Sequence, residues 1–209
     1  MIGKAHQLPF TGLKLSRVVT EMDTAGRFLR EFIKSPAEVG SICPSSSVLA
    51  AALISPVPLG GEGLIIDLGA GSGPVSAELI RAGIQKDRII AVEALKGFSS
   101  SFSRHCPGVP LIIADAGNLG VVLEQHAPDR KVDAIISSLP FRTMSAEVTA
   151  AILAEVRKVM LERGGILVQY SYAWWLRYPL KRHGLAPQRA SLVIRNLPPA
   201  RVEAYAGQR

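Results

Sequence analysis

A glycine-rich turn in the first third of the chain constrains the fold more than any other feature. It follows the apolar residues 64–66 and precedes residues 74–82, which have helical character. Its residues are, in order, Asp67, Leu68, Gly69, Ala70, Gly71, Ser72 and Gly73. Glycines let a backbone turn sharply and leave room for a ligand at the start of a helix. The dinucleotide pattern G-x-G-x-x-G does not fit, because Pro74 stands where its third glycine is required. We therefore predict a ligand-binding turn of another kind.

Apolar runs and helical stretches alternate after this turn. Strands are expected at residues 64–66, 89–92, 111–113, 132–137 and 166–170, and helices at 74–82, 119–124 and 145–161. Continuous apolar strands between helices are typical of a parallel sheet covered on both faces. Residues 191–195 and 201–205 flank an Asn-Leu-Pro-Pro turn, which predicts a terminal hairpin. The prediction is an α/β, Rossmann-like fold with a mostly parallel seven-stranded sheet and a C-terminal antiparallel hairpin.

Acidic residues end two later strands of this pattern. Glu93 closes the second strand and Asp115 closes the third. A carboxylate at the first of these positions can accept hydrogen bonds from both hydroxyls of a ribose. Together with the turn, they resemble the site of class I S-adenosylmethionine methyltransferases, whose first motif is acid-x-G-x-G-x-G. The alternative is that they are solvated strand ends beside a tight turn. The expected cofactor-binding residues are Asp67, Gly69, Ala70, Gly71, Gly73, Glu93, Ala94, Asp115 and Ala116.

A proline-containing loop follows the fourth strand. Its residues 137–141, Ser-Ser-Leu-Pro-Phe, resemble the N-L-P-Y or N-P-P-Y motif of methyltransferases that alkylate exocyclic amines. Serine replaces the Asn of that motif, and a hydroxyl cannot reproduce the bidentate geometry of a carboxamide. The alternative is an ordinary Pro turn. The expected catalytic residues are Ser138, Leu139, Pro140 and Tyr172, and the proton acceptor is left open between Tyr172, Tyr170 and the Ser138 carbonyl.

Charge and aromatic residues point to an anionic partner. The chain has a formal net charge of +7, with basic ends around an acidic middle. Such asymmetry suits a nucleic acid or an anionic membrane surface. Basic and aromatic side chains gather after the fifth strand, where they can contact a lipid phosphate or hold a methylated cation, or simply form a solvated face. The expected substrate-binding residues are Tyr170, Trp174, Arg177 and Arg195, with Lys181 and Arg182 as further phosphate contacts.

Two helices are expected before the first strand. In residues 13–34, apolar side chains recur at helical spacing and basic side chains fall largely off that stripe. This amphipathic helix can lie in a lipid interface or cover the sheet. A second helix is expected at residues 48–54, with the serines at 45–47 as its N-cap. No secretory signal is visible, and prolines at 44, 56 and 58 argue against a membrane span in residues 39–61.

Several motifs resemble those of bacterial phospholipid N-methyltransferases. They are residues 39–47, the glycine turn, Ser138-Leu139-Pro140, Gln169-Tyr170-Ser171-Tyr172 and residues 193–202. The resemblance implies a domain at 37–209 that methylates phosphatidylethanolamine toward phosphatidylcholine and a membrane-associating helix at 1–36. Ornithine lipid N-methyltransferases share most of this pattern, and rRNA adenine dimethyltransferases share the core.

The resemblance implies S-adenosylmethionine as cofactor, S-adenosylhomocysteine as product, and no metal. The two cysteines, Cys43 and Cys106, have no metal-site spacing. The expected partners are an anionic membrane surface and an amine-bearing lipid, with the protein attached peripherally to the inner face of the cell membrane. Nucleic acid is a weaker expectation, and the oligomeric state is left open, a monomer included. The rival hypotheses are an RNA or protein N-methyltransferase and a non-catalytic membrane-binding protein.

Overall fold

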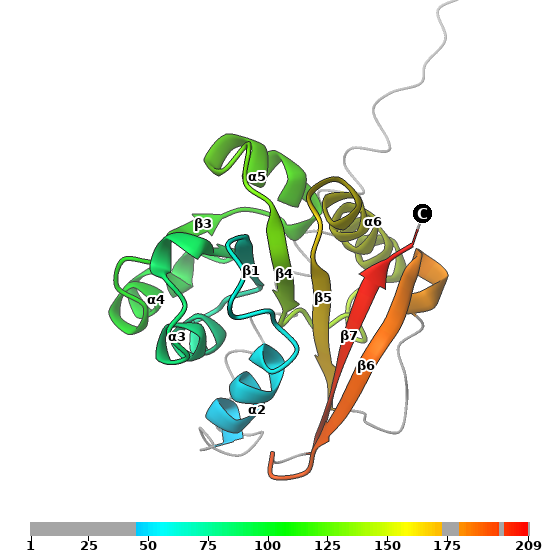
Figure 1. The fold of residues 1–209 in the computed structure, drawn as a ribbon, viewed down its shortest axis with the longest axis horizontal. Coiled ribbons are helices and arrows are strands. Elements are labelled where there is room, and N and C mark those ends of the chain that lie inside the picture. The colour runs from blue at the N-terminus through cyan, green and yellow to red at the C-terminus, as the bar shows by residue number, and fades with distance from the viewer. Residues whose placement is uncertain (1–44, 173–179, 197–198, 209) are drawn as a thin grey trace, which may run out of the picture.

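A seven-stranded sheet forms the centre of the computed structural model, which describes residues 45–172, 180–196 and 199–208 (Figure 1). The strand order is β3-β2-β1-β4-β5-β7-β6, and every neighbouring pair is parallel except those that include β7. The strands are β1 (Leu64–Leu68), β2 (Ile89–Glu93), β3 (Leu111–Ile113), β4 (Val132–Ser137), β5 (Ile166–Ser171), β6 (Leu185–Val193) and β7 (Ala200–Gly207). The predicted fold, with its C-terminal antiparallel hairpin, is confirmed.

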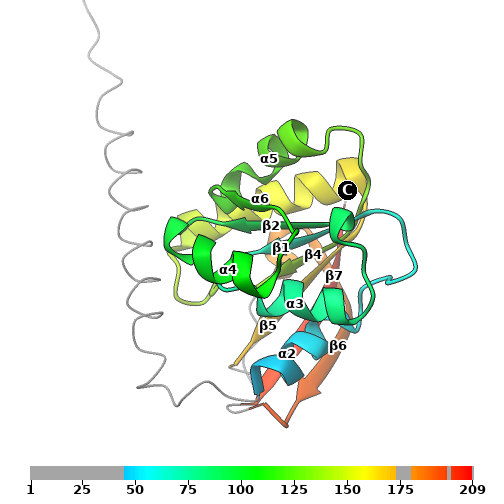
Figure 2. The ribbon, with the colours of Figure 1, turned by 90° about the vertical axis from the view of Figure 1, so that its left-hand side faces the viewer.

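Helices cover both faces of the sheet. Figure 2 shows α5 and α6 on one face and α2, α3 and α4 on the other. The helices are α2 (Ser45–Ile54), α3 (Pro74–Arg81), α4 (Ser99–His105), α5 (Leu119–His126) and α6 (Ala146–Arg163). Short 3-10 turns are η1 (Lys86–Arg88), η2 (Lys96–Phe98), η3 (Ala116–Asn118) and η4 (Leu180–His183).

The buried strands explain this layering. All five residues of β1 and of β2 are buried. Side chains alternate along a strand, so Ile65 enters the core under α2, α3 and α4, whereas Ile66 enters the core under α5 and α6. A strand that is apolar on both faces must be covered on both, which is the arrangement expected from the continuous apolar runs.

Local sequence sets the helix boundaries. Gly73 has a φ of 92°, in the left-handed region, and Pro74 occupies the first turn of α3, where its missing N–H is not needed. The side chain of Ser145 accepts a hydrogen bond from the backbone N–H of Val148 and caps α6. These features allow α3 to start directly after the glycine turn.

Four expectations need correction or fall outside the described residues. The structure adds α4, and β6 begins at Leu185, well before the predicted strand at 191–195. The serines at 45–47 lie inside α2 instead of capping it. The expected helix at residues 13–34 lies outside the described residues. Within the described part of the chain, no helix is long and apolar enough to cross a membrane.

Strand directions bring distant segments to one edge of the sheet. Because β7 is antiparallel to both β5 and β6, β6 runs parallel to β5, and its end at Val193 lies at the edge where β5 ends. This carboxyl edge is at the bottom of Figure 1, beside α2. It therefore combines the glycine turn, the loop after β4 and the tip of the terminal hairpin.

Candidate functional site

The glycine turn between β1 and α3 is the best defined part of the site. Gly69, Gly71 and Gly73 have φ angles of 79°, 54° and 92°. A Cβ built on Gly69 would lie 2.8 Å from Leu139 Cδ2, and one on Gly73 would lie 2.7 Å from Cys106 Sγ. A Cβ on Gly71 would meet no atom within 4 Å. The first and third glycines are thus required by packing, whereas the second borders open space.

Glu93 lies beside this open space at the end of β2. Its side chain is buried, and its two oxygens accept hydrogen bonds from different backbone groups. The N–H of Gly71 donates to Oε2 and the N–H of Leu95 donates to Oε1, both at 2.9 Å between nitrogen and oxygen. These bonds hold the Glu93 side chain at the position expected for ribose recognition.

Asp67 has a structural partner that the sequence did not reveal. The backbone N–H and the hydroxyl of Ser76, in the first turn of α3, donate to Asp67 Oδ2 at 3.0 and 2.6 Å. Its other oxygen, Oδ1, is buried without a hydrogen-bond partner. Burial is the main cause that raises the pKa of Asp67 to about 6, opposed by the Ser76 bonds and assisted by the charge of Glu93. Two neighbouring carboxylates with an unpartnered oxygen favour a cationic ligand.

The remaining cofactor candidates follow the ends of β1, β2 and β3. Ala70 and Ala116 are buried, and the Ala70 N–H donates to the Val92 carbonyl at 3.2 Å. Asp115 accepts a hydrogen bond at Oδ1 from the N–H of Gly117 at 2.7 Å and caps η3. Ala94 is exposed directly after Glu93. The three strand ends thus lie side by side, as predicted for the cofactor site.

S-adenosylmethionine fits these residues. Its sulfonium and ammonium groups suit the acidic pair Asp67 and Glu93, and its ribose hydroxyls suit the Glu93 carboxylate. The space beside Gly71 allows the cofactor to approach the main chain. The fit rests on the unpartnered Oδ1 of Asp67 and on this open glycine position. Among the described residues, no group of three or more His, Cys, Asp or Glu side chains is arranged to bind a metal.

The loop after β4 contacts the glycine turn directly. The N–H of Ser138 donates to the carbonyl of Leu68 at 2.9 Å, and the Leu139 side chain lies against Gly69. The carboxamide of Gln169, on β5, donates through Nε2 to the Leu139 carbonyl at 3.0 Å. The loop turns after Pro140, whose carbonyl accepts from the N–H of Thr143 at 2.9 Å. The structure thus brings the predicted transfer loop to the glycine turn.

Phe141 occupies the position of the aromatic residue in the amine-alkylating motif. Its ring is buried in the core under α5 and α6 instead of facing open space. It therefore offers no exposed face on which a flat base can stack.

The aromatic candidates on β5 are only partly described. The rings of Tyr170 and Tyr172 meet edge to face, with centroids 5.2 Å apart. Burial, and secondarily the neighbouring Tyr172, raises the pKa of Tyr170 well above its ordinary value. Tyr172 is exposed at the end of the strand, which leaves it the more accessible of the two. Trp174 and Arg177 lie outside the described residues.

The basic candidates after β5 separate into two places. Arg195 is exposed just beyond the end of β6, at the carboxyl edge. Lys181 and Arg182 are in η4, which precedes β6 and therefore lies at the opposite, amino-terminal edge. Lys181 and Arg182, which were predicted as further phosphate contacts, therefore lie apart from the carboxyl edge, whereas Arg195, the predicted alternative to them, lies on it.

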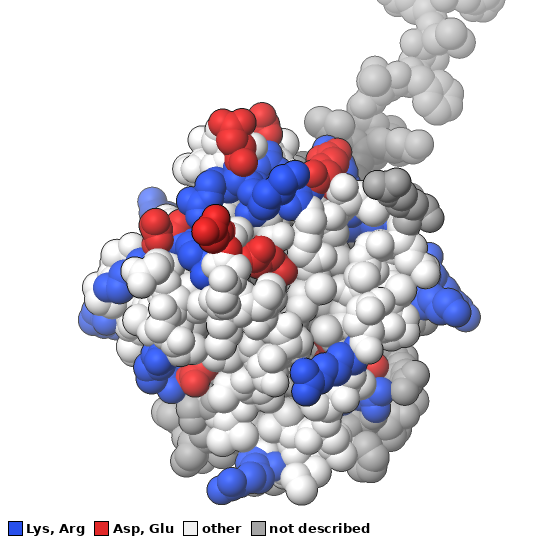
Figure 3. Space-filling view, viewed as in Figure 1, with Lys and Arg blue, Asp and Glu red and all other residues white. Residues whose placement is uncertain are grey.

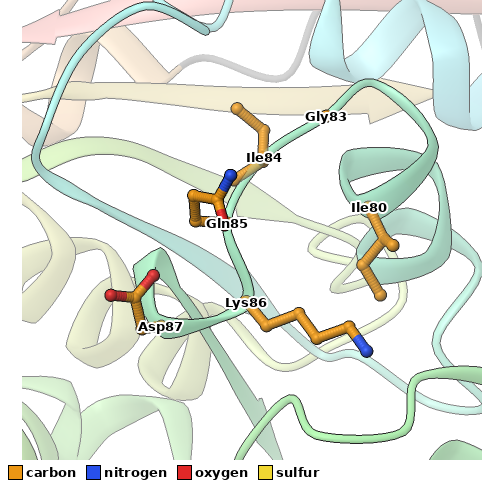
Figure 4. A pocket seen from close by; sticks show the side chains of 6 residues that line it. All are labelled: Ile80, Gly83, Ile84, Gln85, Lys86 and Asp87. Carbon is orange, nitrogen blue, oxygen red and sulfur yellow. The ribbon is translucent and has the colours of Figure 1, made fainter.

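A surface hollow of about 550 Å³ lies away from this site. It is lined by Ile80, Gly83, Ile84, Gln85, Lys86 and Asp87 (Figure 4). These residues connect the end of α3 to the start of β2, at the amino-terminal edge of the sheet. Figure 4 shows Lys86 and Asp87 directed to different sides. Lys86 Nζ donates to the Pro107 carbonyl at 2.8 Å, so this side chain already has a structural partner.

Comparisons with known proteins agree with this geometry. Residues 65–165 match the family model described as "Methyltransferase domain". A curated relative, the ornithine lipid N-methyltransferase of Singulisphaera acidiphila, is 25% identical over 177 residues, which cover 83% of this chain and 91% of the relative.

Solved structures share the fold at low identity. The 1,6-didemethyltoxoflavin-N1-methyltransferase of Burkholderia thailandensis, with bound S-adenosylhomocysteine, gives a TM-score of 0.59 at 13% identity and covers 98% of this chain and 94% of its own. The glycopeptide N-methyltransferase MtfA, complexed with S-adenosylmethionine, gives a TM-score of 0.57 at 13% identity and covers 78% of this chain and 94% of its own.

Proposed function

The chain carries a class I S-adenosylmethionine-dependent methyltransferase domain, and we propose that it methylates the amino headgroup of a membrane lipid. The observation that carries this proposal is the likeness, over 83% of the chain, to a relative described as an ornithine lipid N-methyltransferase. The proposed acceptor is an ornithine lipid or phosphatidylethanolamine, methylated toward phosphatidylcholine in the second case. Both offer a primary amine close to an anionic group.

The transfer loop supports a lipid amine over a nucleobase. Ser138 replaces the carboxamide that would hold the exocyclic amine of a base, and the Phe141 ring is buried in the core. An aliphatic amine needs neither a bidentate carboxamide nor a stacking ring. It needs a narrow approach to the methyl donor, which the contact between Leu139 and Gly69 provides at the wall of the cofactor turn.

The surface around the site supports a lipid partner. Leu192 and Ile194, at the end of β6 and just beyond it, are 48% and 70% exposed at the carboxyl edge. Figure 3 shows that charged side chains gather toward the top of this face, whereas its lower part is mostly uncharged, with isolated basic and acidic groups. Exposed aliphatic residues with nearby cations suit the interface of an anionic membrane. We therefore propose peripheral attachment to the inner face of the cell membrane, with the N-terminal 36 residues as a further contact.

The residues of the site have separate proposed roles in the reaction. When bound, S-adenosylmethionine supplies an electrophilic methyl group. Glu93 and Asp67 hold and orient the donor, and Leu139 packs against Gly69 to keep water from the reacting centre. The acceptor nitrogen reacts as a neutral amine, so its ammonium proton must leave first. Tyr172, exposed at the end of β5, is the proposed carrier of that proton to solvent.

The experiment that tests this proposal determines which of three acceptors the protein methylates. Purified full-length protein is incubated with methyl-labelled S-adenosylmethionine and one of three acceptors: phosphatidylethanolamine vesicles, ornithine lipid vesicles or ribosomal RNA. Label in the lipid fraction is the expected result, and the two vesicle types identify the headgroup. Label in RNA with unlabelled lipid would refute the proposal. Deleting residues 1–34 is expected to lower cosedimentation with anionic vesicles.

A further inference from the structure

Four polar side chains form a cluster on one face of β5 and β7. Gln169 is paired with Glu203 and Ser171 with Arg201 in the antiparallel register. Directly paired residues of adjacent strands project to the same face. The preceding pair, Leu167 and Tyr205, lies in the core under α5 and α6, and side chains two residues apart share a face. The polar cluster therefore lies on the same face as this core, between it and the carboxyl edge of the sheet.

Atoms of this cluster are buried without hydrogen bonds. They are Gln169 Oε1, Ser171 Oγ and Arg201 Nε. Arg201 Nε is 3.0 Å from Glu203 Oε1, an ion-pair distance, but the pair lacks hydrogen-bond geometry. A buried polar group without a partner costs about 1–3 kcal/mol, so Gln169 Oε1 and Ser171 Oγ, next to this ion pair, favour a ligand that satisfies them.

The cluster adjoins the transfer loop. The Nε2 group of Gln169 is bound to the Leu139 carbonyl, and the Leu139 side chain lies against Gly69. One side chain therefore separates the cluster from the cofactor turn. On its other side, Leu192 of β6 is paired with Arg201 and is exposed, so the cluster opens toward an aliphatic surface.

We propose that Arg201 and Glu203 form the headgroup subsite and select a zwitterion, a ligand that carries an amine and an anion a few bonds apart. This inference rests on the proposed function and names the feature by which the acceptor is recognised. The guanidinium of Arg201 binds the carboxylate or phosphate of the headgroup, and the Glu203 carboxylate with Gln169 Oε1 receives its ammonium group. The lipid chains extend past Leu192.

The charge balance of the pair explains why a zwitterion is favoured. Arg201 and Glu203 neutralise each other, and both side chains are largely buried. A ligand with a single charge would compete for one member of this ion pair and offer no opposite charge to the other in a poorly solvated site, which is costly. A zwitterion replaces the internal pair with two new pairs of opposite sign. Simple alkylamines and neutral bases are therefore poor acceptors.

The experiment compares an acceptor that carries an anion near its amine with an acceptor that lacks one. Full-length protein is assayed in detergent micelles with the zwitterionic lipid that the wild type methylates and with a long-chain alkylamine. Variants Arg201→Gln and Glu203→Gln are compared with Arg189→Gln, which removes an exposed charge from the same hairpin. S-adenosylhomocysteine affinity and thermal unfolding are measured for each.

The subsite predicts a specific pattern. Both single variants should raise the KM for the zwitterionic lipid roughly tenfold or more, because the headgroup loses one of its two charged contacts. Arg201→Gln should also lower the ratio of kcat/KM for the zwitterionic lipid to kcat/KM for the alkylamine. The S-adenosylhomocysteine affinity of both variants should stay within about twofold of the wild-type value. Arg189→Gln should have the wild-type KM and acceptor preference.

Other outcomes separate failure of this subsite from failure of the proposed function. If the wild type methylates lipid and both variants keep its KM and its acceptor preference, the subsite is refuted and the lipid function stands. A fall in thermal stability alone, with an unchanged acceptor preference, refutes it as well by showing a structural pair. If the wild type methylates no lipid at all, the proposed function itself fails.

Discussion

The carboxylate of Glu93 accepts a hydrogen bond from the backbone N–H of Gly71, 2.9 Å away, across the ends of β1 and β2. This bond joins the second glycine of the turn to the acid that closes the next strand. Because a Cβ on Gly71 would meet no atom within 4 Å, the carboxylate is held at the border of open space. The turn and the acid therefore form one unit, preset for a ligand.

Glu93→Gln is expected to weaken S-adenosylhomocysteine binding by roughly 10- to 100-fold, since hydrogen bonds to a charged acceptor contribute about 1.5–3 kcal/mol. The amide cannot accept hydrogen bonds from the Gly71 and Leu95 N–H groups at both ends. Titration calorimetry measures the affinity, with Glu62→Gln, an exposed position, as the control. Unchanged affinity in Glu93→Gln would contradict the ribose assignment.

Alanine at two glycines of the turn should lower the unfolding free energy by different amounts. Gly71→Ala should cost only about 1 kcal/mol of unfolding free energy, because its φ of 54° is mildly unfavourable for alanine and the space is open. It should nevertheless abolish cofactor binding by filling that space. Gly69→Ala should destabilise more, because the new Cβ would overlap Leu139 at 2.8 Å. Urea unfolding and calorimetry check both, and wild-type affinity in Gly71→Ala would count against the site.

The raised pKa of Asp67 predicts that the stability of the fold depends on pH. Its pKa is about 6 in the folded chain against an ordinary value of 3.8 for a free side chain, so the folded chain binds more protons than the unfolded chain between these pH values. Stability due to this group therefore falls as pH rises from about 4 to 6. Asp67→Asn removes this fall, so from pH 4.5 to 7.5 its unfolding free energy should gain about 2 kcal/mol relative to the wild type. Parallel urea titrations of the two proteins at both pH values measure this change. An equal difference in unfolding free energy between variant and wild type at the two pH values would disprove the raised pKa of Asp67.

Ile194→Asn should lower partitioning onto anionic vesicles roughly tenfold, because burying a large aliphatic side chain contributes about 1.5–3 kcal/mol. Ile194 is 70% exposed in the turn after β6, at the carboxyl edge. The control is Leu59→Asn, a residue that is 40% exposed near Arg88 at the other edge of the sheet. Cosedimentation compares the two, and equal losses would show that the hairpin tip has no special role.

Most of the fold was predictable because apolar runs mark buried strands. The five parallel strands were placed correctly, and their boundaries shift by a few residues at most. The helix α4 was missed because its sequence Ser-Ser-Ser-Phe-Ser-Arg-His has one buried apolar residue, Phe102, and serines that favour helix poorly. The start of β6 was missed because Pro187 lies at a register shift on an edge strand, where proline is tolerated.

The site was predictable where spacing along the chain determines contact. The glycine turn, Glu93 and the loop after β4 meet because parallel strands end at one edge. The partner of Asp67, Ser76, was not predicted, because a helix N-terminus can be held by several side chains. Arg201 lies in the motif at residues 193–202 and Glu203 directly follows it, but neither was predicted as a site residue. Their position opposite Ser171 and Gln169 depends on the register between β5 and β7, which no local sequence pattern encodes.

The strand order assigns the two reactants to different halves of the sheet. β1, β2 and β3 carry the proposed donor residues on one side, whereas β5 and β7 carry the proposed acceptor residues on the other, and the loop after β4 contacts both the glycine turn and Gln169. Substitutions in the terminal hairpin are therefore expected to affect the acceptor half more than the donor half. A scaffold divided in this way can diversify its acceptors during evolution while it retains one methyl donor.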